Sequence, residues 1–136
     1  MGALVGEGAA AGDVIVAPAT PPGISALAVV RLTGPEGETL RVSRAFAPAL
    51  PERPVPRQLH RVRLVDAAGR GFDEATAIFF AAPRSATGEE VVEVICHGAP
   101  AVVSALLESA CAAGARLARN GEFTRRALAA SDAPGR

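Results

Sequence analysis

Runs of apolar residues, some alternating with polar ones and some with helical spacing, divide this chain into strands and helices. Alternation at every second residue is typical of a strand, whereas apolar residues at i, i+3 and i+4 indicate an amphipathic helix. The sequence predicts strands at 13–20, 25–32, 59–66, 72–83 and 89–97, a short strand and turn at 115–121, and helices at 36–47, 101–114 and 122–131. This order, β-β-α-β-β-β-α-β-α with a hairpin in the middle, predicts an α+β fold, with helices packed on one face of a mixed β-sheet.

The patterns of two strands predict where they lie in the sheet. The segment SALAVVRL, 25–32, is apolar on both faces and is therefore expected to be central. LHRVRLVD, 59–66, alternates: Val62 and Leu64 share one face, and Arg61 and Arg63 share the other. That alternation indicates a strand with one exposed face.

Length and composition describe a single globular domain. The chain has 136 residues, of which 49% are hydrophobic, enough for one core but too few for two ordinary domains. Its formal net charge of zero argues against a protein that binds nucleic acid by electrostatic attraction alone. All 14 basic side chains are Arg, and without Lys the chain cannot contain a Walker-type phosphate loop, G-x-x-x-x-G-K-[ST]. We therefore expect no GTP hydrolysis by this chain alone.

The sequence has no feature of an export signal or a membrane anchor. Residues 1–12 lack a basic region and are interpreted as a flexible leader, and no apolar run approaches the roughly 20 residues of a membrane span. Two cysteines, Cys96 and Cys111, are too few for a secreted disulfide framework. These features predict a cytoplasmic protein.

The stretch TGEEVVEVICHGAP, 87–100, contains the adjacent pair Cys96-His97. Neighbouring residues on a strand point to opposite faces, so the two side chains are badly placed to act as nucleophile and base. The cysteines and histidines also lack zinc-ligand spacing. We assign no catalytic or metal-binding residue here, and expect Cys96 and Cys111 in the core and His97 bonded to backbone.

Glu93 in the same stretch is a carboxylate inside an apolar strand, and Arg31 repeats the pattern with opposite charge. A buried carboxylate without a partner costs several kcal/mol, so Glu93 needs a cation, hydrogen-bond donors or a solvated groove. One interpretation is an internal Arg31–Glu93 ion pair, or two residues at a sheet edge. The other is a shared pocket for a ligand with both donors and acceptors. Glu89, Glu90, Asp73 and Glu74 are interpreted as solvated residues at strand ends and in a hairpin.

Four stretches together resemble the N-terminal domain of the tRNA-modification GTPase family MnmE, also called TrmE. They are spread over residues 13–128: D-x-I-V-A-x-A-T-P-P-G (13–23), A-x-A-V-V-R-L-T-G-P (26–35), A-P-x-S-x-T-G-E-E-V-V-E-x-x-C-H-G (82–98) and G-A-R-x-A-R-x-G-E-F-T-x-R-A (114–127).

This resemblance implies an α+β domain similar to the folate-binding domains of aminomethyltransferases, which forms a homodimer and binds a tetrahydrofolate derivative, 5,10-methylene- or 5-formyl-tetrahydrofolate. By motif matching, the folate-contacting residues are Arg31 and Glu93. The full-length family protein acts with FAD-dependent MnmG (GidA) on the wobble uridine of tRNA. The resemblance implies no GTP, potassium or magnesium site in this domain. The alternatives are a free-standing folate-dependent one-carbon transferase and a purely structural dimerisation module.

The sequence departs from the family pattern in its last residues. Asp132 stands where the family has a Lys that contacts folate, which reverses the charge. Residues 129–136 also lose the helical pattern of the following family domain, and we interpret them as an atypical tail and a possible truncation without the helical and GTPase domains. Folate affinity is expected to be weaker as a result.

Overall fold

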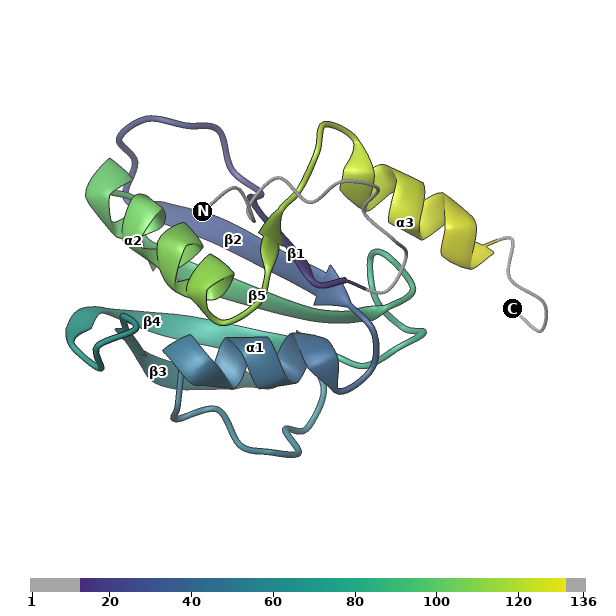
Figure 1. The fold of residues 1–136 in the computed structure, drawn as a ribbon, viewed down its shortest axis with the longest axis horizontal. Coiled ribbons are helices and arrows are strands. Elements are labelled where there is room, and N and C mark those ends of the chain that lie inside the picture. The colour runs from purple at the N-terminus through teal and green to yellow at the C-terminus, as the bar shows by residue number, and fades with distance from the viewer. Residues whose placement is uncertain (1–12, 132–136) are drawn as a thin grey trace.

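The computed structural model describes residues 13–131, which form a mixed sheet and three helices (Figure 1). The predicted order of elements is confirmed, and so is the α+β class. The strands are β1 (Ile15–Pro18), β2 (Leu27–Gly34), β3 (Leu59–Val65), β4 (Gly71–Phe80), β5 (Glu90–His97) and β6 (Arg116–Leu117), and the helices are α1 (Glu38–Phe46), α2 (Pro100–Ala112) and α3 (Glu122–Ser131). The expected leader 1–12 and the departure at Asp132 lie outside the described residues.

The sheet has the strand order β3-β4-β5-β2-β1-β6. Its neighbours pair antiparallel except β1 and β6, which run parallel, so the sheet is mixed as predicted. β2 lies between β5 and β1, which confirms the central position expected for 25–32. β3 lies at the edge, with Val62 and Leu64 buried and Arg61 and Arg63 exposed.

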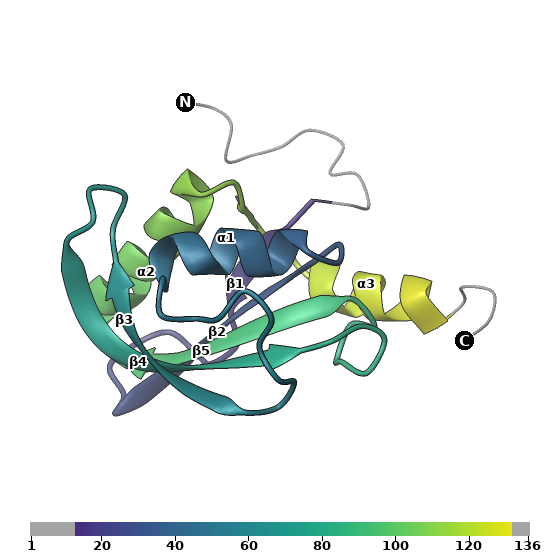
Figure 2. The ribbon, with the colours of Figure 1, turned by 90° about the horizontal axis from the view of Figure 1, so that it is seen from below.

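The core lies between the sheet and helices α1 and α2, which lie on the same side of it (Figure 2). Every second residue of the two central strands points into this core because side chains alternate along a strand. The buried side chains include Val30 and Leu32 on β2, Val92 and Val94 on β5, and Phe46 of α1. The opposite surface of the sheet, which we call the open face, therefore carries the remaining residues of each strand.

Helix α1 begins without a polar capping side chain, because its N-cap is Gly37 with φ of 87°. The first backbone N–H groups of a helix lack partners within it. Glu90 of β5 supplies both acceptors: its Oε1 accepts from Gly37 N at 3.0 Å, and its Oε2 accepts from Leu40 N at 2.9 Å. Glu90 is buried, so its interpretation as a solvated strand-end residue is wrong.

Helix α2 ends where the sequence predicts. Gly114 follows its last turn with φ of 117°, a conformation that side chains other than glycine rarely adopt. Among the described residues, no helix has the length and apolar composition needed to cross a membrane.

Candidate ligand-binding site

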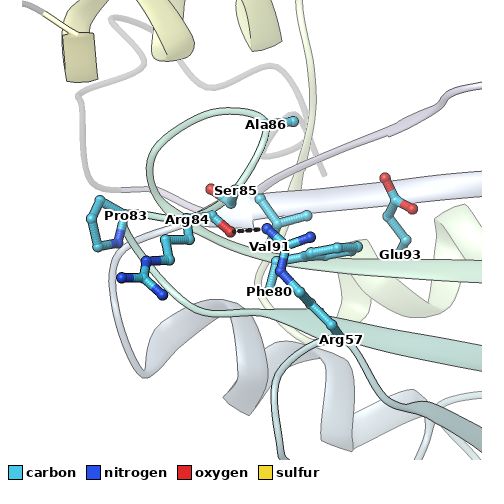
Figure 3. Close-up of a pocket in the computed structure, with 8 residues that line it drawn as sticks. All are labelled: Arg57, Phe80, Pro83, Arg84, Ser85, Ala86, Val91 and Glu93. Carbon is cyan, nitrogen blue, oxygen red and sulfur yellow. Dashed lines mark hydrogen bonds between the residues drawn. The ribbon is translucent and has the colours of Figure 1, made fainter.

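Arg31 and Glu93 face each other across the β2–β5 pair on the open face. The neighbours of each on its own strand, Val30 and Leu32 on β2 and Val92 and Val94 on β5, point into the core, so alternation places both charged side chains on the other side. Figure 3 shows Glu93 on its strand beside the pocket residues.

The two side chains form an ion pair that uses one carboxylate oxygen. Arg31 Nε donates to Glu93 Oε2 at 2.8 Å, and Arg31 Nη2 lies 2.7 Å from the same oxygen. Within residues 13–131, Glu93 Oε1 has no hydrogen-bond partner. The side chains remain 31% and 19% exposed, so a ligand on the open face can reach both. Arg31 and Glu93 therefore form the ion pair of the first interpretation, and Glu93 Oε1 can still accept a hydrogen bond from a ligand.

A pocket of about 330 Å³ adjoins Glu93 on the open face (Figure 3). Phe80 and Val91 are direct cross-strand partners on β4 and β5, and both line it. The remaining lining residues are Arg57, Pro83, Arg84, Ser85 and Ala86. A planar ring in this pocket would have Phe80 beside it and the Glu93 carboxylate at its edge.

Arg31 lines a second, smaller hollow of about 140 Å³. Its other lining residues are Ala17, Pro18, Ala19 and Phe123 of α3. The ion pair therefore lies between two hollows, each bordered by one of its members, whereas one of the two interpretations of the sequence was a single shared pocket.

Arg57 also belongs to this site, and the sequence did not predict it. Its guanidinium carbon lies 5.3 Å from the centre of the Phe80 ring, a cation–π distance, and its Nη2 donates to Arg84 O at 3.1 Å. The backbone N–H of Arg57 donates to Phe79 O at 2.8 Å. Arg57 follows a proline-rich segment with no periodicity, so the sequence contained no signal for this contact.

The family profile described as "GTP-binding protein TrmE N-terminus" matches residues 14–131. This chain belongs to the TrmE N-terminal family. It is 45% identical over 116 residues to the tRNA modification GTPase MnmE of Roseiflexus castenholzii, which covers 85% of this chain and 25% of that protein. It is 48% identical over 116 residues to the MnmE of Phenylobacterium zucineum, with coverage of 85% and 25%. The MnmE of Myxococcus xanthus is 46% identical over 115 residues, with coverage of 84% and 26%.

The match confirms the resemblance found in the four sequence motifs, and the TrmE N-terminal family is established for this domain. The chain spans about a quarter of the length of these curated relatives. The Arg31 and Glu93 motifs both fall within the matched residues.

The Cys-His pair of this TrmE domain has no arrangement for nucleophilic catalysis. Cys96 is buried in the core, and burial raises the pKa of its thiol. His97 is on the open side, where its Nδ1 lies 2.7 Å from Asp73 Oδ1 and its backbone N–H donates to Asp73 Oδ2 at 2.9 Å. Burial of Asp73 opposes its ionisation, but the bonds from His97 outweigh burial and lower the pKa of Asp73.

These contacts correct two interpretations. The His97 side chain binds a carboxylate rather than backbone, and the Asp73 side chain is only 10% exposed rather than solvated.

Within the described part of the chain, no group of three or more His, Cys, Asp or Glu residues could hold a metal ion.

Five charged residues, which we call the α3 charge cluster, attach helix α3 to the strands. They are Asp13, Glu89, Arg116, Glu122 and Arg126. Arg116 donates to both oxygens of Glu122, from Nη1 at 3.0 Å and from Nη2 at 2.7 Å. Arg126 donates from Nη1 to Glu89 at 3.1 Å and 3.2 Å, so the interpretation of Glu89 as solvated is also wrong.

Hydrogen bonds from Arg116 lower the pKa of Glu122 to about 2, although burial acts in the opposite direction. The cluster was not predicted, because Asp13 and Glu89 are far in sequence from Arg116, Glu122 and Arg126, and only the folded chain brings them together. Asp13, for example, accepts from Arg116 Nε at 3.1 Å across 103 positions.

Proposed function

We propose that this domain binds a tetrahydrofolate derivative and holds the one-carbon donor used in a tRNA wobble-uridine modification. The observation that carries the proposal is the Glu93 carboxylate, with one oxygen bonded to Arg31 and the other without a partner among residues 13–131, at the edge of a pocket with an aromatic wall. The relatives are named tRNA modification GTPases, which supports the tRNA part of the proposal.

The chemistry of a pterin suits this arrangement. The amino-pyrimidine edge of a pterin presents neighbouring N–H donors, and a carboxylate can accept two such bonds side by side. Arg31 fixes the orientation of the carboxylate through Nε and Nη2. The aromatic side chain of Phe80 then provides an apolar surface beside the ring. The folate is 5,10-methylene- or 5-formyl-tetrahydrofolate in this proposal.

The domain is further proposed to act as a homodimer. Leu27 and Leu59 are 57% and 69% exposed on the open face, and the half-buried Ile78 and Ile95 lie on the strands between them. Exposed apolar side chains spread over one sheet face are typical of a surface that binds another protein, and a second copy of the chain is the proposed partner.

In a longer protein, FAD-dependent MnmG and tRNA are the proposed partners, and the cytoplasm is the proposed location. Neither potassium, magnesium nor GTP is assigned to this domain.

Calorimetric titration with 5-formyl-tetrahydrofolate tests the folate proposal. Wild type is expected to bind, and Glu93→Gln is expected to lose about ten- to hundredfold in affinity, because an amide has one acceptor oxygen and no charge. Glu74→Gln is the matched control, since Glu74 is exposed on β4 and does not line the pocket. Equal binding by all three proteins would reject Glu93 as the folate-contacting residue.

The observed ion pair also fits a second function, a structural dimerisation module in which Arg31 and Glu93 only neutralise each other. The same titration separates the two. A wild-type domain that dimerises but binds no reduced folate supports the structural module.

A further inference from the structure

We propose that Arg57 and Arg84 form a carboxylate-binding subsite at the end of the pocket opposite Glu93. This inference rests on the proposed folate function and deepens it, because it assigns the acidic glutamate tail of the ligand to two named guanidinium groups. Both arginines line the 330 Å³ pocket that Glu93 also lines.

The two guanidinium groups have charge available for a ligand. Arg31, the basic residue on β2, is paired with Glu93. Among residues 13–131, neither Arg57 nor Arg84 has a carboxylate within ion-pair distance. Arg57 uses Nη2 to bond Arg84 O, and its Nε and Nη1 have no acceptor in the described part of the chain.

Arg57 is held in place rather than left mobile. It is the one non-glycine residue among 13–131 with a positive φ, 68°, a conformation that costs energy for a residue with a Cβ. Its backbone bond to Phe79 O and its stacking over Phe80 fix the guanidinium beside the pocket. An unfavourable backbone conformation at a pocket-lining cation is an observation from which a functional role can be inferred.

The pocket has its negative charge, Glu93, and its positive charges, Arg57 and Arg84, at different ends, and this arrangement sets the orientation of a ligand. Glu93 and Val91 are two residues apart on β5, which is about 7 Å along a strand. Phe80, under Arg57, is the cross-strand partner of Val91. The pocket thus offers the Glu93 carboxylate at one end and, towards Phe80, the guanidinium groups of Arg57 and Arg84.

A ligand with an N–H donor edge, a planar ring and an acidic tail matches this order. The donor edge lies at Glu93, and the tail carboxylates lie at Arg57 and Arg84. An Arg fork binds a planar carboxylate through two parallel N–H bonds, which Lys or Gln cannot reproduce.

The test compares two probes, 5-formyl-tetrahydrofolate and a 5-formyl-tetrahydropterin with a methyl group in place of the benzoyl-glutamate tail. Titrations use the full 136-residue chain as wild type, Arg57→Gln, Arg84→Gln, Glu93→Gln and the control Arg53→Gln. Arg53 is exposed in the same segment of chain but does not line the pocket.

Arg57→Gln and Arg84→Gln are expected to weaken the tailed probe by about tenfold or more and to leave the tailless probe unchanged. Glu93→Gln is expected to weaken both probes, and Arg53→Gln neither. The unfolding midpoint of each variant is measured first. Should Arg57→Gln unfold early, Arg84→Gln decides, because it leaves the stacking of Arg57 on Phe80 in place.

Two failures are distinguishable. If the wild type binds the tailed probe and Glu93→Gln weakens it, but Arg57→Gln and Arg84→Gln do not, the subsite inference is wrong and the proposed function stands. If the wild type binds neither probe, the proposed function fails and the subsite fails with it.

Discussion

The open-face ion pair and the α3 charge cluster are both built from Arg and carboxylate side chains, but they differ in burial and in how many of their hydrogen-bonding atoms have partners. In the cluster, the Arg116 side chain is 7% exposed, and its Nε, Nη1 and Nη2 all donate to Asp13, Glu122 or backbone. In the pair, Arg31 is 31% exposed and both of its bonds converge on one oxygen of Glu93. A buried and fully bonded network holds structure, whereas an exposed and partly bonded pair retains donors and acceptors for a ligand.

Breaking the cluster should give the largest loss of stability. Arg116→Ala leaves Glu122 buried without its partner, and we expect the free energy of unfolding in urea to fall by about 3–5 kcal/mol. Arg125→Ala is the control, because Arg125 is exposed and its side chain bonds only Asn120 O, at 3.0 Å, in the described chain. A loss for Arg116→Ala no greater than that for Arg125→Ala would mean that the cluster does not hold α3.

Acid should remove part of the same stabilisation. Bonds from Arg116 lower the pKa of Glu122 from 4.5 to about 2. A lowered pKa in the folded state means that the stabilisation is complete above pH 4.5 and is lost as the pH falls towards 2. The difference corresponds to about 3 kcal/mol. Urea unfolding across this range should show a flatter pH dependence for Glu122→Gln than for wild type, and equal slopes would contradict the assignment.

Glu90, on β5, extends the comparison beyond Glu93 and Glu122. It accepts from two backbone N–H groups at the start of α1, so Glu90→Ala leaves Gly37 N and Leu40 N without their acceptors. We expect a loss of about 1–2 kcal/mol in the free energy of unfolding. The measurement is urea unfolding, with Glu74→Ala as the exposed control. A loss in the free energy of unfolding for Glu90→Ala no greater than that for Glu74→Ala would show that water replaces Glu90.

The open-face pair should contribute least to stability. A double-mutant cycle of Arg31→Ala and Glu93→Ala is expected to give a coupling energy of about 0.2–1 kcal/mol, because water solvates both groups. A coupling energy of several kcal/mol would instead support the structural module, in which the pair exists to stabilise the sheet.

The sequence was sufficient to predict the elements and the face of each strand, because alternation at every second residue determines both. It singled out Arg31 and Glu93 as charged residues in apolar strands, and the register sets them opposite each other. It failed for Glu89 and Glu90, which looked like solvated strand-end residues. Their partners are Arg126 and the start of α1, and nothing in the local pattern indicates that these segments pack there.

The same reason explains why Arg57 was missed. Its place in the pocket depends on a left-handed backbone and a contact with Phe80, which a proline-rich segment does not reveal. The two hollows beside the ion pair likewise arise from the loop at 83–86 and from α3, neither of which the strand pattern locates.

The most direct test of the difference between the two regions is the side-chain carboxyl ¹³C NMR spectrum, recorded during a titration with 5-formyl-tetrahydrofolate. The resonances of Glu93 and Glu122 are assigned by their disappearance in Glu93→Gln and Glu122→Gln. We predict that the Glu93 resonance shifts as the folate binds, while that of Glu122 stays in place. An unchanged Glu93 resonance at a folate concentration that saturates the domain would contradict the assignment of the open-face pair as the ligand-binding one.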